Sequence, residues 1–358
     1  GFSDDGRQGF VDMTRALRSP GSTLKPLVYG LAFDAGIAHP ETLIDDRPTA
    51  FGTYAPQNFD GGFRGTVKVR DALQLSLNLP VVTLTEALGP ANLMAALKRA
   101  GVDARVPGGR AGLAVALGGL GVSLHDMVAL YATLARGGTT VPLRMSIETE
   151  LTQNRRVLSP EAAWHLGDIL SGLTPPGGGE GGQIAWKTGT SYGHRDAWAL
   201  GWDGAHVVGV WIGRPDGTPV PGAFGADLAA PLLFNAFARI GEHRMALPPP
   251  PPATVITSTA KLPGPMRQFR RGGGRALGPD APSVAFPPTG AHLRTTGSTL
   301  TVKVRDGSPP FLWLANGTPV AQPTHDRQVS LTLPGPGFFT LSVIDSKGHS
   351  AKSQVRLD

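Results

Sequence analysis

Three short motifs place hydroxyl and amine groups where they could form and break an acyl bond. Ser22-Thr-Leu-Lys25 puts a hydroxyl and an amine one helical turn apart on a shared face. Proline is tolerated only near the start of a helix, so Pro26 predicts a helix that begins close to Ser22. The hydroxyl would then lie at the positive end of the helix dipole, which stabilises negative charge on an attacking oxygen. The motif predicts a serine nucleophile with a lysine base.

Lys25 must be neutral to act as that base. A free lysine has a pKa near ~10.4, so a base useful near neutrality needs a pKa lower by about three, which is ~4 kcal/mol. Burial and a second nearby cation can together lower the pKa this far. A second S-x-x-K, Ser258 to Lys261, lies in a Pro-rich stretch where helix capping or chance explains it. One such motif alone is therefore weak evidence.

Two further motifs each occur once. Ser76-Leu-Asn78 is the only S-x-N of the chain, and by itself it is typical of a polar turn between helices. Lys187-Thr-Gly189 is the only K-T-G, and it lies with Thr190 in a predicted strand. Glycine weakens a strand unless something must approach its backbone closely. The motif therefore favours a binding edge, with a β-bulge and a solvated lysine as the alternative.

In the order S-x-x-K, S-x-N and K-T-G, the chain resembles the penicillin-binding proteins and the serine β-lactamases. Three segments resemble those of class A penicillin-binding proteins most closely in sequence: Arg18-Ser-Pro-Gly-Ser-Thr-Leu-Lys-Pro26, Tyr54-Ala-Pro-Gln-Asn58 and Lys187-Thr-Gly-Thr-Ser191. The resemblance covers almost the whole chain. It implies a D,D-transpeptidase that crosslinks peptidoglycan stem peptides and is acylated by β-lactam antibiotics.

The resemblance also implies a role for each motif residue. Ser22 would attack the carbonyl of the D-Ala-D-Ala donor, and Lys25 would accept its proton. Ser76 would relay that proton to the leaving amine, and Asn78 would hold the stem-peptide amide and position Lys25. Lys187 would keep Lys25 neutral and attract the substrate carboxylate. An amine of a second stem peptide would then take the acyl group.

The K-T-G strand would bind the donor peptide. The resemblance implies that the hydroxyls of Thr188 and Thr190 hold the carboxylate and that the peptide adds to the strand edge around Gly189. The backbone N–H groups of Ser22 and Thr190 would form the oxyanion hole. Three further residues are candidates for the cleft, with ordinary loop or turn roles as the alternative: Tyr54, Asn58 and His194.

Other functions stay open. A D,D-carboxypeptidase shares every motif residue, and a weakly active or inert scaffold for cell-wall synthesis proteins would use the C-terminal domain as its docking module. A β-lactamase needs a carboxylate for deacylation, and Glu150 is too far from Asn78 to be a convincing one. The segment from Gly189 to Gly193 fits the G-x-S-x-G of other hydrolases, but a strand follows where a helix is needed.

Residues 1–245 mix helices with an antiparallel sheet, which predicts an α+β fold with a helical layer. The resemblance implies that this is the fold of the penicillin-binding transpeptidases and serine β-lactamases. The strands before the active serine of the family would be absent, leaving three of five. The membrane anchor and the glycosyltransferase domain of the family would also be absent. We therefore expect a fragment of a periplasmic protein that is anchored in the inner membrane. The helices are predicted at 24–35, 69–75, 80–88, 90–100, 123–136, 159–171 and 226–240, and the strands at 183–190, 197–202 and 206–212.

The rest of the chain divides into a linker and a small domain. Residues 246–281 are rich in Pro, Gly and Arg, which predicts an extended linker. Residues 282–358 show short alternating runs separated by turns, which predicts an Ig-like antiparallel β-sandwich. Its strands are predicted at 298–304, 310–314, 328–333, 338–344 and 350–357.

Composition excludes several classes of function. The 358 residues include no cysteine, so disulfides and thiolate chemistry are absent, which suits an exported protein. The nine histidines show no metal-binding spacing, and we expect neither a metal nor another cofactor. The net charge is +6, but the basic residues are dispersed apart from a cluster in the linker, so we expect no nucleic-acid partner. The longest nearly apolar run, 111–124, is too short to span a membrane.

Overall fold

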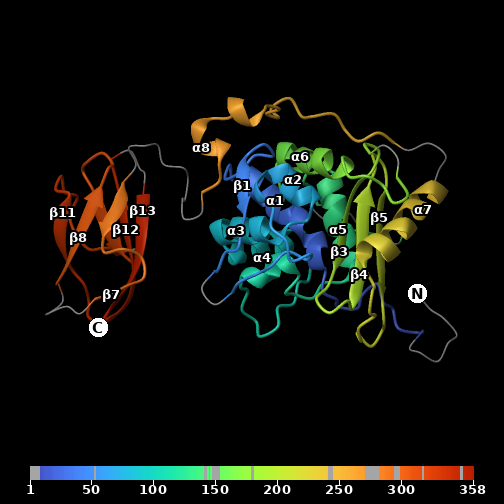
Figure 1. The fold of residues 1–358 in the computed structure, drawn as a ribbon, viewed down its shortest axis with the longest axis horizontal. Helices are drawn as coiled ribbons and strands as arrows, with labels where there is room; N and C mark the ends of the chain where they lie inside the picture. Colours follow the sequence, from blue (N-terminus) through green and yellow to red (C-terminus); the bar gives the residue numbers. More distant parts are fainter. Residues whose placement is uncertain are drawn as a thin grey trace. The chain divides into compact units, whose positions relative to one another are not determined.

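The chain forms two compact units, Gly1–Arg271 and Gly272–Asp358, and each is described by itself (Figure 1). The structure is a computed structural model. It describes residues 9–51, 54–140, 143–144, 146, 154–178, 181–240, 245–270, 282–293, 299–316, 318–346 and 350–358. Glu150, the weighed β-lactamase carboxylate, lies outside these residues.

The sheet of the first unit has three antiparallel strands in the order β3-β4-β5, as predicted. Their bounds are Ala185–Thr190, Asp196–Trp202 and Val207–Gly213. Alternate residues of the central strand face opposite sides. Trp198, Leu200 and Trp202 pack into the main core, and Ala199 packs with α7 (Ala230–Ile240) on the other face. The sheet therefore lies between α7 and the helical layer (Figure 1).

The helical layer surrounds α1 (Lys25–Asp34), in which eight of ten residues are buried. A helix buried on all sides has no polar face, so it can hold Lys25 inside the protein. The predicted helices are confirmed with small shifts at their ends, and the last begins as a π-helical turn, η3 (Gly225–Ala229). The other helices are η1 (Gly21–Leu24), α2 (Val69–Gln74), α3 (Asn78–Leu88), α4 (Pro90–Arg99), η2 (Leu113–Leu117), α5 (Leu124–Ala135) and α6 (Pro160–Ser171).

A short hairpin that we did not predict joins the helical layer. It pairs β1 (Leu43–Asp46) with β2 (Gly65–Lys68) in antiparallel register, from Leu43 opposite Lys68 to Asp46 opposite Gly65. Each strand has only four residues, which is too short for an alternating pattern to stand out. The hairpin brings Asp46 into the interior, where its side chain is fully buried.

Residues 245–270, which we call the strap, pack along the first unit. The predicted linker is corrected here, since this unit extends to Arg271. The Trp164 indole donates to the carbonyl of Pro248 at 3.2 Å, and Phe269 N donates to the carbonyl of Leu43 at 2.7 Å. The Phe269 ring is buried in the core. Prolines lack an N–H but keep their carbonyl, so a Pro-rich segment can dock by accepting hydrogen bonds. Its short helical turns are η4 (Thr259–Lys261) and α8 (Gly264–Arg267).

The second unit is a β-sandwich, as predicted. One sheet has the order β10-β9-β12-β13-β7 and the other β11-β8-β6, and Val302, Trp313 and Leu341 pack between them. The β7–β13 pair is parallel, which the prediction of an antiparallel sandwich did not include. The strands are β6 (Ser283–Phe286), β7 (Ala291–Leu293), β8 (Thr299–Arg305), β9 (Leu312–Ala315), β10 (Thr318–Pro319), β11 (Gln328–Thr332), β12 (Gly337–Ile344) and β13 (Ser350–Leu357).

None of the helices in the described residues has the length and apolar character needed to cross a membrane. No group of three or more His, Cys, Asp or Glu side chains among these residues is placed to hold a metal ion.

Candidate active site

Ser22 lies in a tight turn that is held from two sides. The turn is the 3-10 helix η1, which runs directly into α1 at Lys25, so Ser22 sits at the helix start, as Pro26 predicted. The Tyr131 hydroxyl donates to the carbonyl of Thr23 at 2.8 Å, and the Trp198 indole donates to that of Ser19 at 2.8 Å. Helix α5 and strand β4 thus fix the turn, while Ser22 itself stays partly exposed.

The backbone of β3 lies directly against this turn. A Cβ on Gly189 would lie 2.5 Å from the carbonyl oxygen of Pro20, and one on Gly21 would lie 2.5 Å from that of Thr190. Neither position can hold a side chain unless the backbone moves. The K-T-G glycine thus allows the close approach of another backbone segment, which is the serine turn itself, and the binding edge stays a prediction.

Lys25 is fully buried, and its amine contacts the S-x-N motif. It donates to Asn78 Oδ1 at 2.7 Å and to the backbone carbonyl of Leu77 at 3.2 Å. It also donates to the carbonyl of Ser76, and its distance to the Ser76 hydroxyl is 3.3 Å. Among the residues that the structure describes, the Ser22 hydroxyl has no hydrogen-bond partner. The structure thus joins Lys25 to Ser76 and Asn78 and leaves the Ser22 hydroxyl free.

The electrostatic environment favours a neutral Lys25. Burial, and then the charge of Lys187, hold the pKa of the Lys25 amine well below its ordinary value, and the carboxylate of Asp46 acts in the opposite direction. Lys187 is also buried, and its amine donates to the Thr188 carbonyl at 3.0 Å. Burial lowers the pKa of Lys187 to about 7. The Lys25 amine thus lies in the field of a second amine, in a medium that screens charge poorly.

Ser76 owes its position to an unusual backbone. It lies in the turn between α2 and α3 with a φ of 57°, in the left-handed region that non-glycine residues rarely adopt. In this turn the carbonyl and the hydroxyl of Ser76 both lie near the Lys25 amine. The polar turn that we weighed as an alternative is present, and it is also the segment that contacts Lys25.

Asn58 holds the backbone of Asn78, whose side chain contacts Lys25. Its Oδ1 accepts from the backbone N–H of Asn78 at 2.7 Å, and its Nδ2 donates to both carboxylate oxygens of Asp46, at 2.8 and 2.9 Å. Asn58 therefore supports the site rather than lining the cleft. We did not predict Asp46, because in Leu43-Ile-Asp-Asp46 it has the composition of an ordinary solvated turn.

His194 lies in the turn between β3 and β4, with a φ of 56°. Its ring centre is 4.8 Å from that of Phe224 and 6.0 Å from that of Phe59, which follows Asn58. The turn role that we weighed is present, and the ring also links the K-T-G hairpin to the Asn58 loop. Tyr54 pairs through its backbone with Phe51, and none of its described contacts reaches Lys25 or Lys187.

The hydroxyls of Thr188 and Thr190, on either side of Gly189, differ in their contacts. The Thr190 hydroxyl accepts from the backbone N–H of Gly225 at 3.1 Å, so η3 fixes that end of the strand. Thr188 is half-buried one residue after Lys187. Thr190 can still donate its own hydrogen to a ligand.

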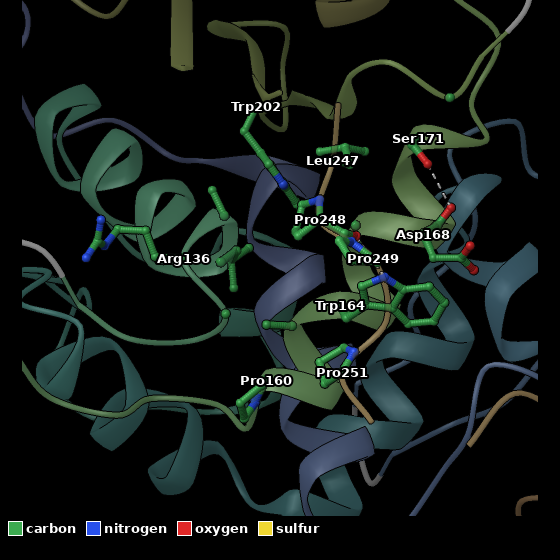
Figure 2. Close-up of a pocket in the computed structure, with 16 residues that line it drawn as sticks. Arg136, Pro160, Trp164, Asp168, Ser171, Trp202, Leu247, Pro248, Pro249 and Pro251 are labelled. Carbon is green, nitrogen blue, oxygen red and sulfur yellow. Dashed lines mark hydrogen bonds between the residues drawn. The ribbon is translucent and has the colours of Figure 1, made fainter. Parts of the chain in front are cut away.

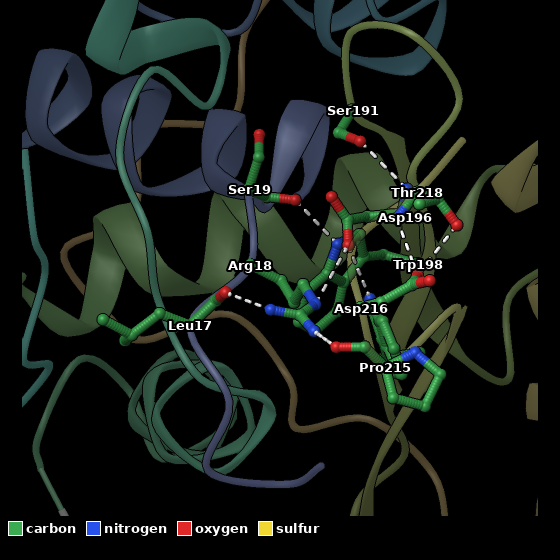
Figure 3. Close-up of polar contacts among 10 residues, drawn as sticks. Leu17, Arg18, Ser19, Ser191, Asp196, Trp198, Pro215, Asp216 and Thr218 are labelled. Carbon is green, nitrogen blue, oxygen red and sulfur yellow. Dashed lines mark hydrogen bonds and ion pairs between the residues drawn. The ribbon is translucent and has the colours of Figure 1, made fainter. Parts of the chain in front are cut away.

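A cluster around Asp196 ties the K-T-G hairpin to the segment before Ser22 (Figure 3). Arg18 Nε lies 3.8 Å from Asp196 Oδ1, which also accepts from the indole of Trp211 at 3.0 Å. The backbone N–H of Asp196 donates to the Ser191 hydroxyl at 2.9 Å. Ser191 is buried and β4 follows it, so the G-x-S-x-G alternative lacks both an accessible hydroxyl and the required helix.

A cavity of about 380 Å³ lies elsewhere, between α6 and the strap (Figure 2). None of the predicted site residues lines it. Its carboxylate, Asp168, pairs with Arg70 at 2.9 Å, and its hydroxyl, Ser171, donates to the Asp168 carbonyl at 3.1 Å. Because these polar groups are already engaged, we assign no chemistry to the cavity.

Comparison with known protein families agrees with the motifs. Residues 10–213 match the penicillin binding protein transpeptidase domain, and residues 271–357 match the Penicillin-Binding Protein C-terminus family. The chain is 44% identical over 261 residues to penicillin-binding protein 1C of Escherichia coli (strain K12), covering 72% of this chain and 34% of that protein. It is 34% identical over 236 residues to penicillin-binding protein 1F of Bacillus subtilis (strain 168), covering 60% and 32%.

Solved structures share the fold. PonA1 from Mycobacterium tuberculosis in complex with penicillin V aligns with a TM-score of 0.58 at 23% identity, over 67% of this chain and 74% of that one. Penicillin-Binding Protein 1A from Haemophilus influenzae aligns with a TM-score of 0.56 at 21% identity, over 66% and 45%. The chain spans about a third of the length of the two curated relatives described above.

Proposed function

Because the chain belongs to the penicillin-binding protein transpeptidase family, we propose that it is a serine D,D-transpeptidase that crosslinks peptidoglycan stem peptides. The proposal rests on one observation. A buried amine, Lys25, contacts Ser76 and Asn78 one helical turn from the Ser22 hydroxyl, and burial and then the charge of Lys187 lower the pKa of that amine. A low pKa suits a general base, and it does not suit a structural cation.

In the proposed acylation, one proton passes from Ser22 to Lys25 and then, through Ser76, to the leaving amine. The Ser22 oxygen forms a bond to the carbonyl carbon of the penultimate D-alanine while its proton passes to neutral Lys25. The C–N bond to the terminal D-alanine then breaks, and the leaving amine takes the proton from Lys25 by way of the Ser76 hydroxyl. The 3.3 Å between the Lys25 amine and that hydroxyl suits this relay. An amine of a second stem peptide then attacks the ester and frees Ser22.

The strand β3 supplies the binding groups in this proposal. The donor carboxylate meets the charge of Lys187 and the hydroxyls of Thr188 and Thr190. The backbone N–H groups of Ser22 and Thr190 face the developing oxyanion, and one such donor is typically worth ~10²–10³ in rate. The contact between Gly21 and the Thr190 backbone supports this pairing, because it keeps the two segments adjacent.

A β-lactam would enter as a mimic of the donor and remain on Ser22 as an ester. We place the reaction outside the cytoplasm, where peptidoglycan lies, and expect the C-terminal sandwich to contact cell-wall synthesis proteins. A D,D-carboxypeptidase would use the same residues with water as the acceptor. Crosslinked dimers from a stem-peptide substrate indicate transpeptidation, and trimmed monomers indicate the carboxypeptidase.

Mass spectrometry of the intact, penicillin-treated protein tests the nucleophile. We expect one adduct on the wild type and none on Ser22→Ala. Ser258→Ala is the matched control, because it removes the exposed serine of the other S-x-x-K and should leave the adduct intact. An adduct that survives in Ser22→Ala would exclude this assignment, and a folded wild type that is never labelled would favour the inert scaffold.

A further inference from the structure

Asp46 is a buried carboxylate to which the proposed mechanism gives no role. Its side chain is fully buried at the end of β1. It accepts from Asn58 Nδ2 at 2.8 and 2.9 Å and from the backbone N–H of Arg64 at 2.8 Å. No salt bridge between described residues involves it. Because only neutral donors hold this charge, its field acts over a distance on the cations of the interior.

A chain of hydrogen bonds connects Asp46 to the Lys25 amine. Asn58 donates from Nδ2 to Asp46 and to the carbonyl of Gly62 at 2.8 Å, and its Oδ1 accepts from Asn78 N at 2.7 Å. Asn78 Oδ1 in turn accepts from Lys25 at 2.7 Å. The acceptors at Asp46 and Gly62 fix which way the Asn58 amide points. Its oxygen is thereby directed to the first residue of α3.

Two charged groups of opposite sign act on Lys25. Burial lowers the pKa of Lys25 most, the charge of Lys187 of β3 lowers it further, and Asp46 of β1 raises it. The two charges therefore act in opposite directions on an amine that burial already keeps neutral. Among the described residues, Tyr29, one turn along α1, also lies in the field of Asp46, and its buried hydroxyl has no hydrogen-bond partner among them. Burial, and then Asp46, raise the pKa of that phenol, so it stays neutral and does not change the balance.

We propose that Asp46 is a positioning residue of the acylation site, which orients Asn78 toward the Lys25 amine through Asn58 and whose charge opposes that of Lys187. The inference rests on the proposed role of Lys25 as the base. It gives Asp46 two separable effects. The hydrogen bonds affect the maximal rate of acylation, and the charge raises the lowest pH at which Lys25 is neutral.

The test measures the second-order rate constant for acylation by a fluorescent penicillin as a function of pH, with folding checked by circular dichroism. Asp46→Asn removes the charge, so Lys25 stays neutral to lower pH and the acid limb of the profile shifts down by about one unit. The plateau falls about tenfold or more, because the new amide faces a donor. Asn58→Ala is the matched control, since it breaks the same chain and keeps the charge. It should lower the plateau with no downward shift of the limb.

A double variant separates charge from shape. Asp46→Asn combined with Asn58→Asp keeps a donor facing an acceptor between these two positions and moves the carboxylate one link nearer to Lys25, while the hydrogen bond to the Gly62 carbonyl is lost. The acid limb of its pH profile should lie at the same pH as in the wild type or at a higher pH. This double variant also provides the test if Asp46→Asn does not fold. Two results would overturn the role of Asp46: an acid limb at lower pH than in the wild type for the double variant, or an unshifted acid limb in folded Asp46→Asn. In either case, acylation of the wild type would still support the proposed function. A wild type that is never acylated overturns both.

Discussion

The substitution Lys187→Met should stabilise the first unit while it removes acylation. Lys187 is 2% exposed, and its amine has one described hydrogen bond, to the Thr188 carbonyl. Methionine has a similar length and no charge, so it can fill the same space without the cost of a buried ammonium. Active sites often hold such strained groups, so the stabilising change is also the one that removes function.

The pKa of Lys187 sets the magnitude and the sign. Burial lowers it from 10.5 to about 7. One pKa unit is worth about 1.4 kcal/mol, so the charged form costs the folded state about 5 kcal/mol as an upper limit. Between about pH 7 and pH 10.5 the unfolded chain binds this proton and the folded chain does not, so wild-type stability rises with pH in this window. The advantage of Lys187→Met is therefore largest below pH 7 and shrinks by about 1.4 kcal/mol per unit above it.

Urea unfolding followed by tryptophan fluorescence at several pH values measures this advantage. The signal reports mainly the first unit, because only Trp313 among the six tryptophans lies in the second. Lys98→Met is the control, since Lys98 is exposed on α4 and its replacement should change stability little at any pH. An advantage of Lys187→Met that does not vary with pH, or a loss of stability below pH 7, would refute the argument that the buried charge is costly.

Three further outcomes follow from the same contacts. Acylation by a penicillin should decline above about pH 7, where Lys187 loses the proton that attracts the ligand carboxylate, and Lys187→Arg should remove this decline in the measured rate profile. Gly189→Ala should lower the acylation rate at least tenfold and cost about 1–3 kcal/mol in urea unfolding, because its Cβ would lie 2.5 Å from the Pro20 oxygen. Gly112→Ala, with open space around it, should change neither. Phe269→Ala should cost about 3–5 kcal/mol and expose the strap to limited proteolysis.

Local patterns predicted the elements whose signals lie within a few residues. Helices α5 and α6 begin where their serines cap them, Ser123 accepting from Asp126 N at 3.0 Å and Ser159 from Ala162 N at 3.2 Å. The strands β8 and β12 alternate buried residues with partly buried or exposed ones over most of their length. The K-T-G glycine was predictable because a glycine in a strand already implies close approach of another segment.

Features that depend on distant segments could not be predicted in this way. Asp46 is buried because Asn58 and the backbone of Arg64 supply donors that water would otherwise supply, and no local pattern announces such donors. The strap has the composition of a linker, and its docking depends on distant partners. Its Pro248 carbonyl accepts from Trp164, 84 residues earlier in the chain, and Phe269 N donates to Leu43. In both cases a contact with a distant segment determines whether the residue is buried.

The two lysines differ in the causes of their low pKa values, and this difference determines how ligand binding at Lys187 changes the pKa of Lys25. Burial alone lowers the pKa of Lys187, whereas Lys25 responds both to burial and to the charge of Lys187. A ligand carboxylate that pairs with Lys187 cancels part of that charge, so the pKa of Lys25 rises when the donor binds. On the proposed function, Lys25 therefore enters the complex neutral and becomes a stronger base once the substrate is seated. The same coupling predicts that a donor lacking the carboxylate loses acylation rate as well as affinity, because it leaves Lys25 in its weaker state.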